Sequence, residues 1–191
     1  MKIIFATNNA HKLAEVSALL GSEYQIVTPR ECGITEDIPE TADTLEGNAL
    51  QKAHYLRNKT GLDCFADDTG LEVEALDGAP GVRSARYATD GHDFEANNRL
   101  LLKSLEGAEC RKARFRTVIA LLQGDREYLF DGVVEGEIAL SHSGVEGFGY
   151  DPIFCPEGSS RTFAEMSTDE KNEISHRARA VRKLVNHLTT K

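Results

Sequence analysis

The amino-acid sequence predicts an α/β protein in which helices flank a mixed β-sheet. Strand and helix patterns alternate in the first half of the chain, strand patterns cluster in the second half, and a long helical stripe follows them. Alternation favours βα units, whereas consecutive strands favour hairpins. Both kinds of strand connection are therefore expected in one sheet.

The first element is a strand over residues 2–6, which are almost entirely apolar. A polar turn over residues 7–12 follows, and then a helix whose apolar stripe ends before Gly21. A strand, a polar turn and a helix in succession present backbone amides and the positive end of the helix to an anion. This region is therefore a candidate anion site.

The remaining elements follow from periodicity and from turn residues. Further strands are expected at residues 24–28, 62–66, 71–76, 113–122 and 129–134, the last two as a hairpin across Gly124-Asp125. Further helices are expected at residues 44–58, with Gly61 beyond the end, at residues 93–105, after the capping box Ser167–Glu170, and along the stripe 174–188.

Composition favours an ordinary cytoplasmic globular protein with a single domain over residues 1–191. The net charge of −9 disfavours nucleic acid as a partner, because phosphate backbones bind clustered Lys and Arg. The four cysteines form no CxxC pair, which fits a reducing compartment without a zinc site or disulfides. No apolar run approaches the length that spans a membrane, so no membrane association is expected.

Asp67-Asp68-Thr69-Gly70 is the most informative motif, and it is expected at a turn after the strand 62–66. Two adjacent carboxylates repel each other, and burying them requires a cation or hydrogen bonds. A divalent ion such as Mg²⁺ is the usual compensation. The alternative is a solvated Asx turn.

Three further features each admit a structural and a functional interpretation. Thr7-Asn8-Asn9 with Lys12 is either a phosphate cradle or a helix N-cap with an exposed lysine. Lys52 projects from the apolar stripe of its helix, so it either extends along the edge of the core or points into a cleft. Residues 148–151 form either a structural turn or a site where aromatic rings stack on a base and Asp151 accepts a hydrogen bond from it.

The last helix carries one more expectation. On a single unbroken helix, Lys171 and His176 would point roughly 140° apart, so we expect a break between Asn172 and Ser175. Ser175 would then cap a new helix that begins at His176, with Arg177 in its first turn at the mouth of the cleft. The alternative for Ser175-His176-Arg177 is plain exposed helix surface, and His176, nearly opposite Ile174 on a helical wheel, is not expected to be a core histidine.

Eight motifs occur in a fixed order, and together they are more specific than any one of them. They are Thr7-Asn8-Asn9-x-x-Lys12, Pro39-Glu40-Thr41, Glu46-x-Asn48-Ala49-x-x-Lys52-Ala53, Asp67-Asp68-Thr69-Gly70-Leu71, Gly78-Ala79-Pro80-Gly81, Ser84-Ala85-Arg86-Tyr87, Gly147-Phe148-Gly149-Tyr150-Asp151-Pro152, and Glu170-Lys171-Asn172 with Ser175-His176-Arg177. Over residues 2–185, this series resembles the inosine/xanthosine triphosphate pyrophosphatase family.

The resemblance implies a fold and an activity. The expected fold is an elongated mixed sheet with two lobes around a central substrate cleft, in a homodimer. The expected activity is Mg²⁺-dependent hydrolysis of ITP, dITP and XTP to the monophosphate and pyrophosphate, which cleanses the nucleotide pool.

The resemblance also assigns roles to particular residues. It implies Glu40, Asp67 and Asp68 as metal ligands, with Asp68 also the base that activates water. Phosphates would be bound by Thr7, Asn8, Asn9, Ala10, His11, Lys12, Lys52, Thr69 and Lys171, and the base by Phe148, Gly149, Tyr150, Asp151, His176 and Arg177. Two departures from some relatives concern Asn8, where they have glycine, and Asp67, where they have Glu.

Two other functions compete with this one. A Maf-like pyrophosphatase would share the architecture but act on other nucleotides, and the Phe148–Asp151 and Ser175–Arg177 segments argue against it. A non-catalytic nucleotide-binding module would gain nothing from two carboxylates that face phosphates.

Overall fold

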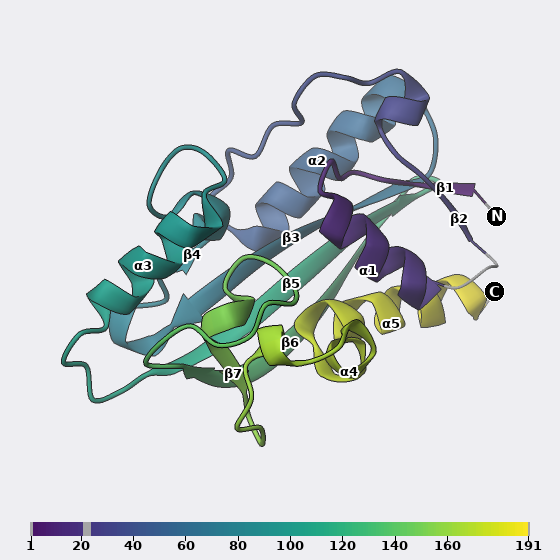
Figure 1. Cartoon of the computed structure of the whole chain (residues 1–191). Helices are drawn as coiled ribbons and strands as arrows, with labels where there is room; N and C mark the ends of the chain where they lie inside the picture. Colours follow the sequence, from purple (N-terminus) through teal and green to yellow (C-terminus); the bar gives the residue numbers. More distant parts are fainter. Residues whose placement is uncertain (1, 21–23, 191) are drawn as a thin grey trace. The chain divides into compact units, whose positions relative to one another are not determined.

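The protein is described here from a computed structural model, which covers residues 2–20 and 24–190 (Figure 1). Its strands are β1 (Lys2–Phe5), β2 (Gln25–Val27), β3 (Cys64–Val73), β4 (Pro80–Gly81), β5 (Lys112–Gln123), β6 (Arg126–Ile138) and β7 (Phe154–Pro156). Its α-helices are α1 (Ala10–Leu20), α2 (Leu45–Thr60), α3 (Phe94–Ser104), α4 (Thr168–Ile174) and α5 (His176–Thr189).

The strands form a mixed sheet in the order β2-β1-β3-β5-β6-β7, with β4 paired to β3. β1 runs parallel to β2 and to β3, whereas β7 runs antiparallel to β6. Only Gly124 and Asp125 separate the neighbouring strands β5 and β6, so these strands form the predicted hairpin. The predicted fold class, a mixed sheet flanked by helices, is confirmed.

The chain divides into two compact units. Unit 1 comprises Met1–Asp68, Thr117–Gly132 and Arg177–Lys191, and unit 2 comprises Thr69–Arg116 and Val133–His176. Strands β3, β5 and β6 contribute residues to both units. A single catalytic domain over residues 1–191, with two lobes around a cleft, stays a prediction.

In unit 1, alternate residues of the strands face two separate cores. Ile4 of β1 and Ala66 of β3 belong to a cluster that packs against Ala49 and Leu56 of α2. Phe5 and Phe65 point the other way, stack with ring centroids 4.5 Å apart, and join a cluster with residues of α1 and α5. Helix α2 thus covers one face of these strands, and α1 and α5 cover the other (Figure 1).

Unit 2 has its own core on its share of the sheet. Leu101 and Leu105, at the end of α3, pack with residues of β3, β5 and β6 and with the segment 150–166. Phe115, Phe154 and Phe163 form an aromatic group within this core, with centroid separations of 4.7 to 6.2 Å. Tyr150, in the segment 147–151, belongs to this core.

Three local predictions are wrong or lie outside the described residues. β3 runs without interruption through Asp67-Asp68-Thr69-Gly70, so the predicted turn there is wrong. The predicted strand 71–76 ends at Val73, because residues 74–76 form a 3₁₀ turn. Gly21, predicted to end the first helix, lies outside the described residues.

Candidate active site

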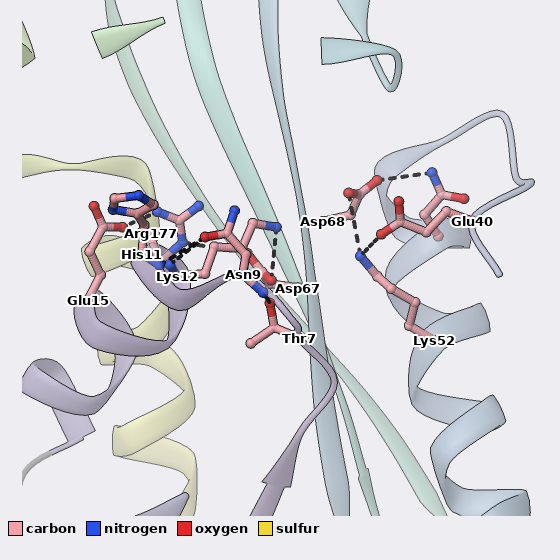
Figure 2. A network of polar contacts seen from close by, with 11 residues as sticks. Thr7, Asn9, His11, Lys12, Glu15, Glu40, Lys52, Asp67, Asp68 and Arg177 are labelled. Atoms are coloured by element: carbon pink, nitrogen blue, oxygen red, sulfur yellow. Dashed lines mark hydrogen bonds and ion pairs between the residues drawn. The ribbon is translucent and has the colours of Figure 1, made fainter. Parts of the chain in front are cut away.

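Asp67 lies in the middle of β3 and is almost completely buried, with 1% of its surface exposed. Its Oδ1 accepts a hydrogen bond from Lys12 Nζ at 3.1 Å, and its Oδ2 lies 3.5 Å from Arg177 Nε (Figure 2). Two cations therefore compensate one buried carboxylate. This explains how a charged residue is tolerated at the centre of a strand.

The turn before α1 places Lys12. Thr7 Oγ1 accepts a hydrogen bond from the Asn9 amide at 3.1 Å, and Asn9 Oδ1 accepts from the amides of His11 and Lys12 at 2.9 and 3.2 Å. Asn9 is thus the N-cap of α1, as one of the two interpretations predicted. That interpretation also made Lys12 exposed, which is wrong, because its side chain is only 16% exposed and binds Asp67.

Arg177 lies in the first turn of α5 and is 2% exposed. Its Nη1 donates to Glu15 Oε2 on α1, and Glu15 is itself buried at 8% exposure. The predicted position at the mouth of a cleft is therefore wrong, because the guanidinium is enclosed between Glu15 and Asp67 (Figure 2). A contact between Arg177 and a purine oxygen stays a prediction.

Glu15 is a site residue that sequence reasoning missed. It was overlooked because a glutamate two turns into a helix is usually solvated. Its position three residues after Lys12 was the available signal, since residues three apart on a helix share a face. Lys12 binds Asp67 and Glu15 binds Arg177. Arg177 in turn lies beside Asp67, so the four side chains form one buried network.

Asp68 points to the opposite side of β3 and meets α2. Its Oδ2 accepts a hydrogen bond from Asn48 Nδ2 at 3.0 Å, and its Oδ1 lies 3.7 Å from Lys52 Nζ. Lys52 Nζ also donates to Glu40 Oε1, in the loop before α2 (Figure 2). Lys52 is 5% exposed, so it points at these carboxylates and does not extend along the edge of the core.

Asn48 is a second residue that sequence reasoning did not place in the site. It lies one turn before Lys52 on α2 and, besides its bond to Asp68, accepts the amide of Ala42 at 2.9 Å. The side chain therefore ties Asp68 to the loop that carries Glu40. Thr44 begins the helix by accepting the amide of Gly47 at 3.0 Å, which fixes where Asn48 and Lys52 emerge.

The two aspartates differ in their pKa values. Burial alone would raise the pKa of Asp67, but Lys12 and Arg177 outweigh burial and lower this pKa to about 2. For Asp68 burial dominates and raises the pKa, although Lys52 and Lys12 oppose the shift. Neighbouring carboxylates whose pKa values move apart are typical of sites that divide ionic and proton-transfer roles.

The structure does not gather the three predicted metal ligands. Glu40 and Asp68 share Lys52, whereas Asp67 faces Lys12 on the other side of the strand. The cause is strand geometry, because successive side chains point to opposite faces of a sheet. Within residues 2–20 and 24–190, no group of three or more His, Cys, Asp and Glu side chains could hold a metal ion. Metal binding by Glu40, Asp67 and Asp68 stays a prediction.

In unit 2 the segment 147–151 folds around the Asp151 carboxylate. Asp151 is 2% exposed, and its Oδ2 accepts hydrogen bonds from the Phe148 amide at 2.8 Å and from Lys171 Nζ at 2.7 Å. A Cβ atom on Gly147, which has φ +75°, would lie 2.1 Å from that oxygen, so only glycine fits there. Asp151 thus holds the loop together.

Lys171 faces aromatic rings as well as Asp151. Its Nζ lies 5.1 Å from the ring centroid of Phe148 and 5.7 Å from that of Phe163, within the range of cation–π attraction. The side chain is 6% exposed. The structure therefore places Lys171 with the predicted base-binding loop, and a phosphate contact stays a prediction.

His176 is a buried residue, at 3% exposure, so the prediction that it is not a core histidine is wrong. Its ring stacks on Phe115 with centroids 4.6 Å apart and planes 15° apart. The helix break explains the difference. α4 ends at Ile174, Ser175 is extended with ψ 156°, and α5 begins at His176, so the helical wheel drawn from Ile174 does not apply. The break itself is confirmed.

The other predicted site residues occupy ordinary positions. Asn8, Ala10 and His11 are exposed, in the turn before α1 and in its first turn. Thr69 on β3 and Gly149, with φ +63°, are half-buried. Tyr150 is buried, and its hydroxyl donates to Ser84 O at 2.8 Å.

None of the helices over residues 2–20 and 24–190 has the length and apolar character needed to span a membrane.

Fold and site together define a class: a mixed α/β protein whose unit 1 concentrates buried lysines and carboxylates on both sides of one strand. The match to a family model is more specific. Residues 3–187 match the model of the Ham1 family, and the chain belongs to this family.

Individual relatives agree with this assignment. The chain is 56% identical over 184 residues to a dITP/XTP pyrophosphatase of Porphyromonas gingivalis, covering 96% of this chain and 95% of the relative. It is 50% identical over 189 residues to a dITP/XTP pyrophosphatase of Flavobacterium johnsoniae, covering 99% and 98%. A solved Ham1 protein of Coxiella burnetii is 41% identical, covers 100% of both chains and superposes with a TM-score of 0.92.

Proposed function

We propose that this protein hydrolyses the non-canonical purine nucleoside triphosphates dITP, ITP and XTP to the monophosphate and pyrophosphate. The observation that carries the proposal is the full-length match to dITP/XTP pyrophosphatases at 50 to 56% identity. The charge arrangement is consistent with it, since an acidic protein needs local lysines to hold a triphosphate. Removal of such nucleotides cleanses the nucleotide pool.

The residues of unit 1 supply the chemistry of water attack. A bond forms between the water oxygen and the α-phosphorus, the bond from that phosphorus to the bridging oxygen breaks, and pyrophosphate leaves with the electron pair. Asp68 accepts the proton of the water, because its pKa is raised and Asn48 fixes its orientation. Lys12 and Lys52 offset the charge of the phosphates.

Mg²⁺ is the metal that the residues around Asp68 would accommodate. Glu40 and Asp68 already converge on one cation, the Lys52 ammonium, and carboxylate oxygens are the ligands that Mg²⁺ prefers. Bound there, the ion would clamp phosphate oxygens and lower the pKa of water. Asp67 is held by Lys12 and Arg177, so it supports the strand next to this set.

In this proposal the base is bound by Phe148, Gly149, Tyr150, Asp151, His176 and Arg177. The half-buried Phe148 ring offers a face for stacking. A polar site of this kind discriminates between a 6-keto and a 6-amino purine, because one accepts a hydrogen bond where the other donates.

The experiment is a turnover assay of the full chain with ITP, dITP, XTP, ATP and GTP. The monophosphate and pyrophosphate are separated by ion-exchange chromatography. We expect hydrolysis of the first three substrates with Mg²⁺, loss of activity with EDTA, and recovery on adding Mg²⁺ in excess. Equal turnover of ATP and ITP would contradict the proposed substrate class, and activity that survives EDTA would contradict the metal.

We further propose that the protein acts as a homodimer in the cytoplasm. Sedimentation velocity on the purified chain tests the oligomeric state, and a single species of about 21 kDa, the mass of one chain, would contradict it.

A further inference from the structure

Asn98 is a buried polar residue that none of the roles above uses. It lies on the second turn of α3 and is 3% exposed. Its Nδ2 donates to the carbonyl oxygen of Gly149 at 3.0 Å, in the middle of the loop 147–151. Its Oδ1 is buried without a hydrogen-bond partner among the described residues.

A buried amide with one orphaned oxygen is costly, because each unmet polar atom loses its interaction with water. A leucine has the same branched shape without polar atoms, so it would avoid that cost. The hydrogen bond that the buried Asn98 amide does make runs from its Nδ2 to the Gly149 carbonyl. Asn98 therefore has a role in the conformation of the loop.

Phe94 makes a second contact from the same helix face. It precedes Asn98 by four residues, and residues at this spacing lie one above the other on a helix. Its ring meets that of Phe148, with centroids 6.1 Å apart and planes inclined by 47°. Helix α3 thus presents one aromatic and one amide side chain to two consecutive residues of the loop, Phe148 and Gly149.

The conformation of the loop depends on side-chain contacts. Gly147 and Gly149 both have positive φ angles, and glycine imposes little backbone preference of its own. Asp151 fixes the loop from within, through the Phe148 amide. Asn98, on α3, donates to the carbonyl oxygen of Gly149, the residue next to Phe148.

We propose that Asn98 is a specificity-determining positioning residue, which acts on the purine through the Gly149 peptide and the Phe148 ring. The inference rests on the proposed function, in which this loop binds the base. Loss of Asn98 frees the loop and weakens discrimination between purines, while the water-activating residues of unit 1 remain intact.

The test compares Asn98→Leu with wild type in kcat and KM for ITP and ATP. We expect KM for ITP to rise about 3- to 10-fold, the effect of one hydrogen bond, with kcat changed by less than about twofold. The ratio of kcat/KM for ITP to that for ATP should fall by the same factor. Calorimetric binding of IMP, with AMP as comparison, should show the same loss without turnover.

Asn97 offers a matched control on the same helix. It is 2% exposed, accepts the Ala88 amide at 2.8 Å and donates to the Ala85 carbonyl at 3.1 Å, so it holds a different segment. Asn97→Ala should lower the melting temperature and leave the ITP/ATP ratio unchanged. If Asn98→Leu does not fold, Asn98→Ala replaces it in the kinetic comparison, because the smaller side chain leaves room for water.

The outcomes separate the two proposals. If wild type does not hydrolyse ITP, the proposed function fails. If wild type is active and the Asn98 variants lose ITP and ATP turnover by one common factor, or if Asn97→Ala shifts the ratio equally, Asn98 is merely structural and this inference is overturned.

Discussion

Asp67 and Asp68 are neighbours on one strand, yet they belong to two different environments. Asp67 faces α1 and α5, where Lys12 and Arg177 enclose it. Asp68 faces α2, where one lysine is shared with Glu40 and the other polar partner is the neutral Asn48. The pKa of the first carboxylate is lowered to about 2, and the pKa of the second is raised. A strand can thus give two adjacent carboxylates opposite pKa shifts, because its side chains alternate.

The largest expected effect concerns Asp68. Asp68→Asn keeps the shape and the contact with Asn48 but removes the base, so turnover of ITP should fall by about 10²- to 10⁴-fold. The stability of the fold should hold, because the raised pKa shows that burial disfavours this charge. Steady-state kinetics and urea unfolding of the same preparation provide both readouts. Near-normal turnover of Asp68→Asn would show that another residue is the general base.

Asp67→Asn is the matched variant and should act on stability. It leaves Lys12 and Arg177 without the carboxylate that compensates them, and breaking a buried ion pair costs about 3–5 kcal/mol. The measurement is the free energy of unfolding in urea. An exposed pair, Lys183 with Asp131, offers the control, since Lys183→Ala should cost less than about 1 kcal/mol. Equal losses in the two variants would refute the difference between buried and exposed pairs.

Lys52→Met tests the cation on the α2 side. A methionine fits the buried stem, but Glu40 and Asp68 lose the charge that holds them, and a phosphate loses its partner. We expect kcat/KM for ITP to fall about 10- to 100-fold, the range of a hydrogen bond to a charged group. The pKa of Asp68 should rise further, so the variant should be less active at low pH than the wild type. If Lys52→Met is fully active, Lys52 does not contact the phosphates and only packs in the structure.

The smallest effects concern the helix caps that aim the two lysines. Asn9 caps α1, which carries Lys12, and Thr44 caps α2, which carries Lys52. Asn9→Ala and Thr44→Ala should each lower the free energy of unfolding by about 1 kcal/mol. Because Lys52 lies beside the proposed base Asp68, whereas Lys12 binds Asp67, Thr44→Ala should reduce turnover more than Asn9→Ala does. Equal losses of turnover in Asn9→Ala and Thr44→Ala would contradict the different roles of the two sides of the strand.

Much of the fold was predictable because local rules determine it. Thr44 and Gly61 bracket α2 as an N-cap and a left-handed C-cap, and Ser167 with Glu170 forms the predicted capping box. The break before His176 followed from the demand that Lys171 and His176 serve one site, and the structure confirms it. The Ham1 match confirms the predicted family, and the names of its relatives agree with the predicted activity.

The site was predicted less well, since tertiary contacts decide it. A turn at Asp67 was inferred from the cost of burying two acids, whereas the strand continues because cations from other elements compensate them. His176 and Arg177 looked exposed in sequence, but distant partners, Phe115 and Glu15, bury them. Glu15 and Asn98 carried no motif of their own, and Asn48 stood in a motif to which no role was assigned for it.

The central claim is that water attacks the α-phosphorus with Asp68 as the base, and one measurement tests it directly. ITP is hydrolysed in water enriched in ¹⁸O, and the products are analysed by mass spectrometry. The account predicts one ¹⁸O atom in IMP and none in pyrophosphate, with labelled IMP formed far more slowly by Asp68→Asn. Label in pyrophosphate, or formation of IDP and orthophosphate, would contradict it.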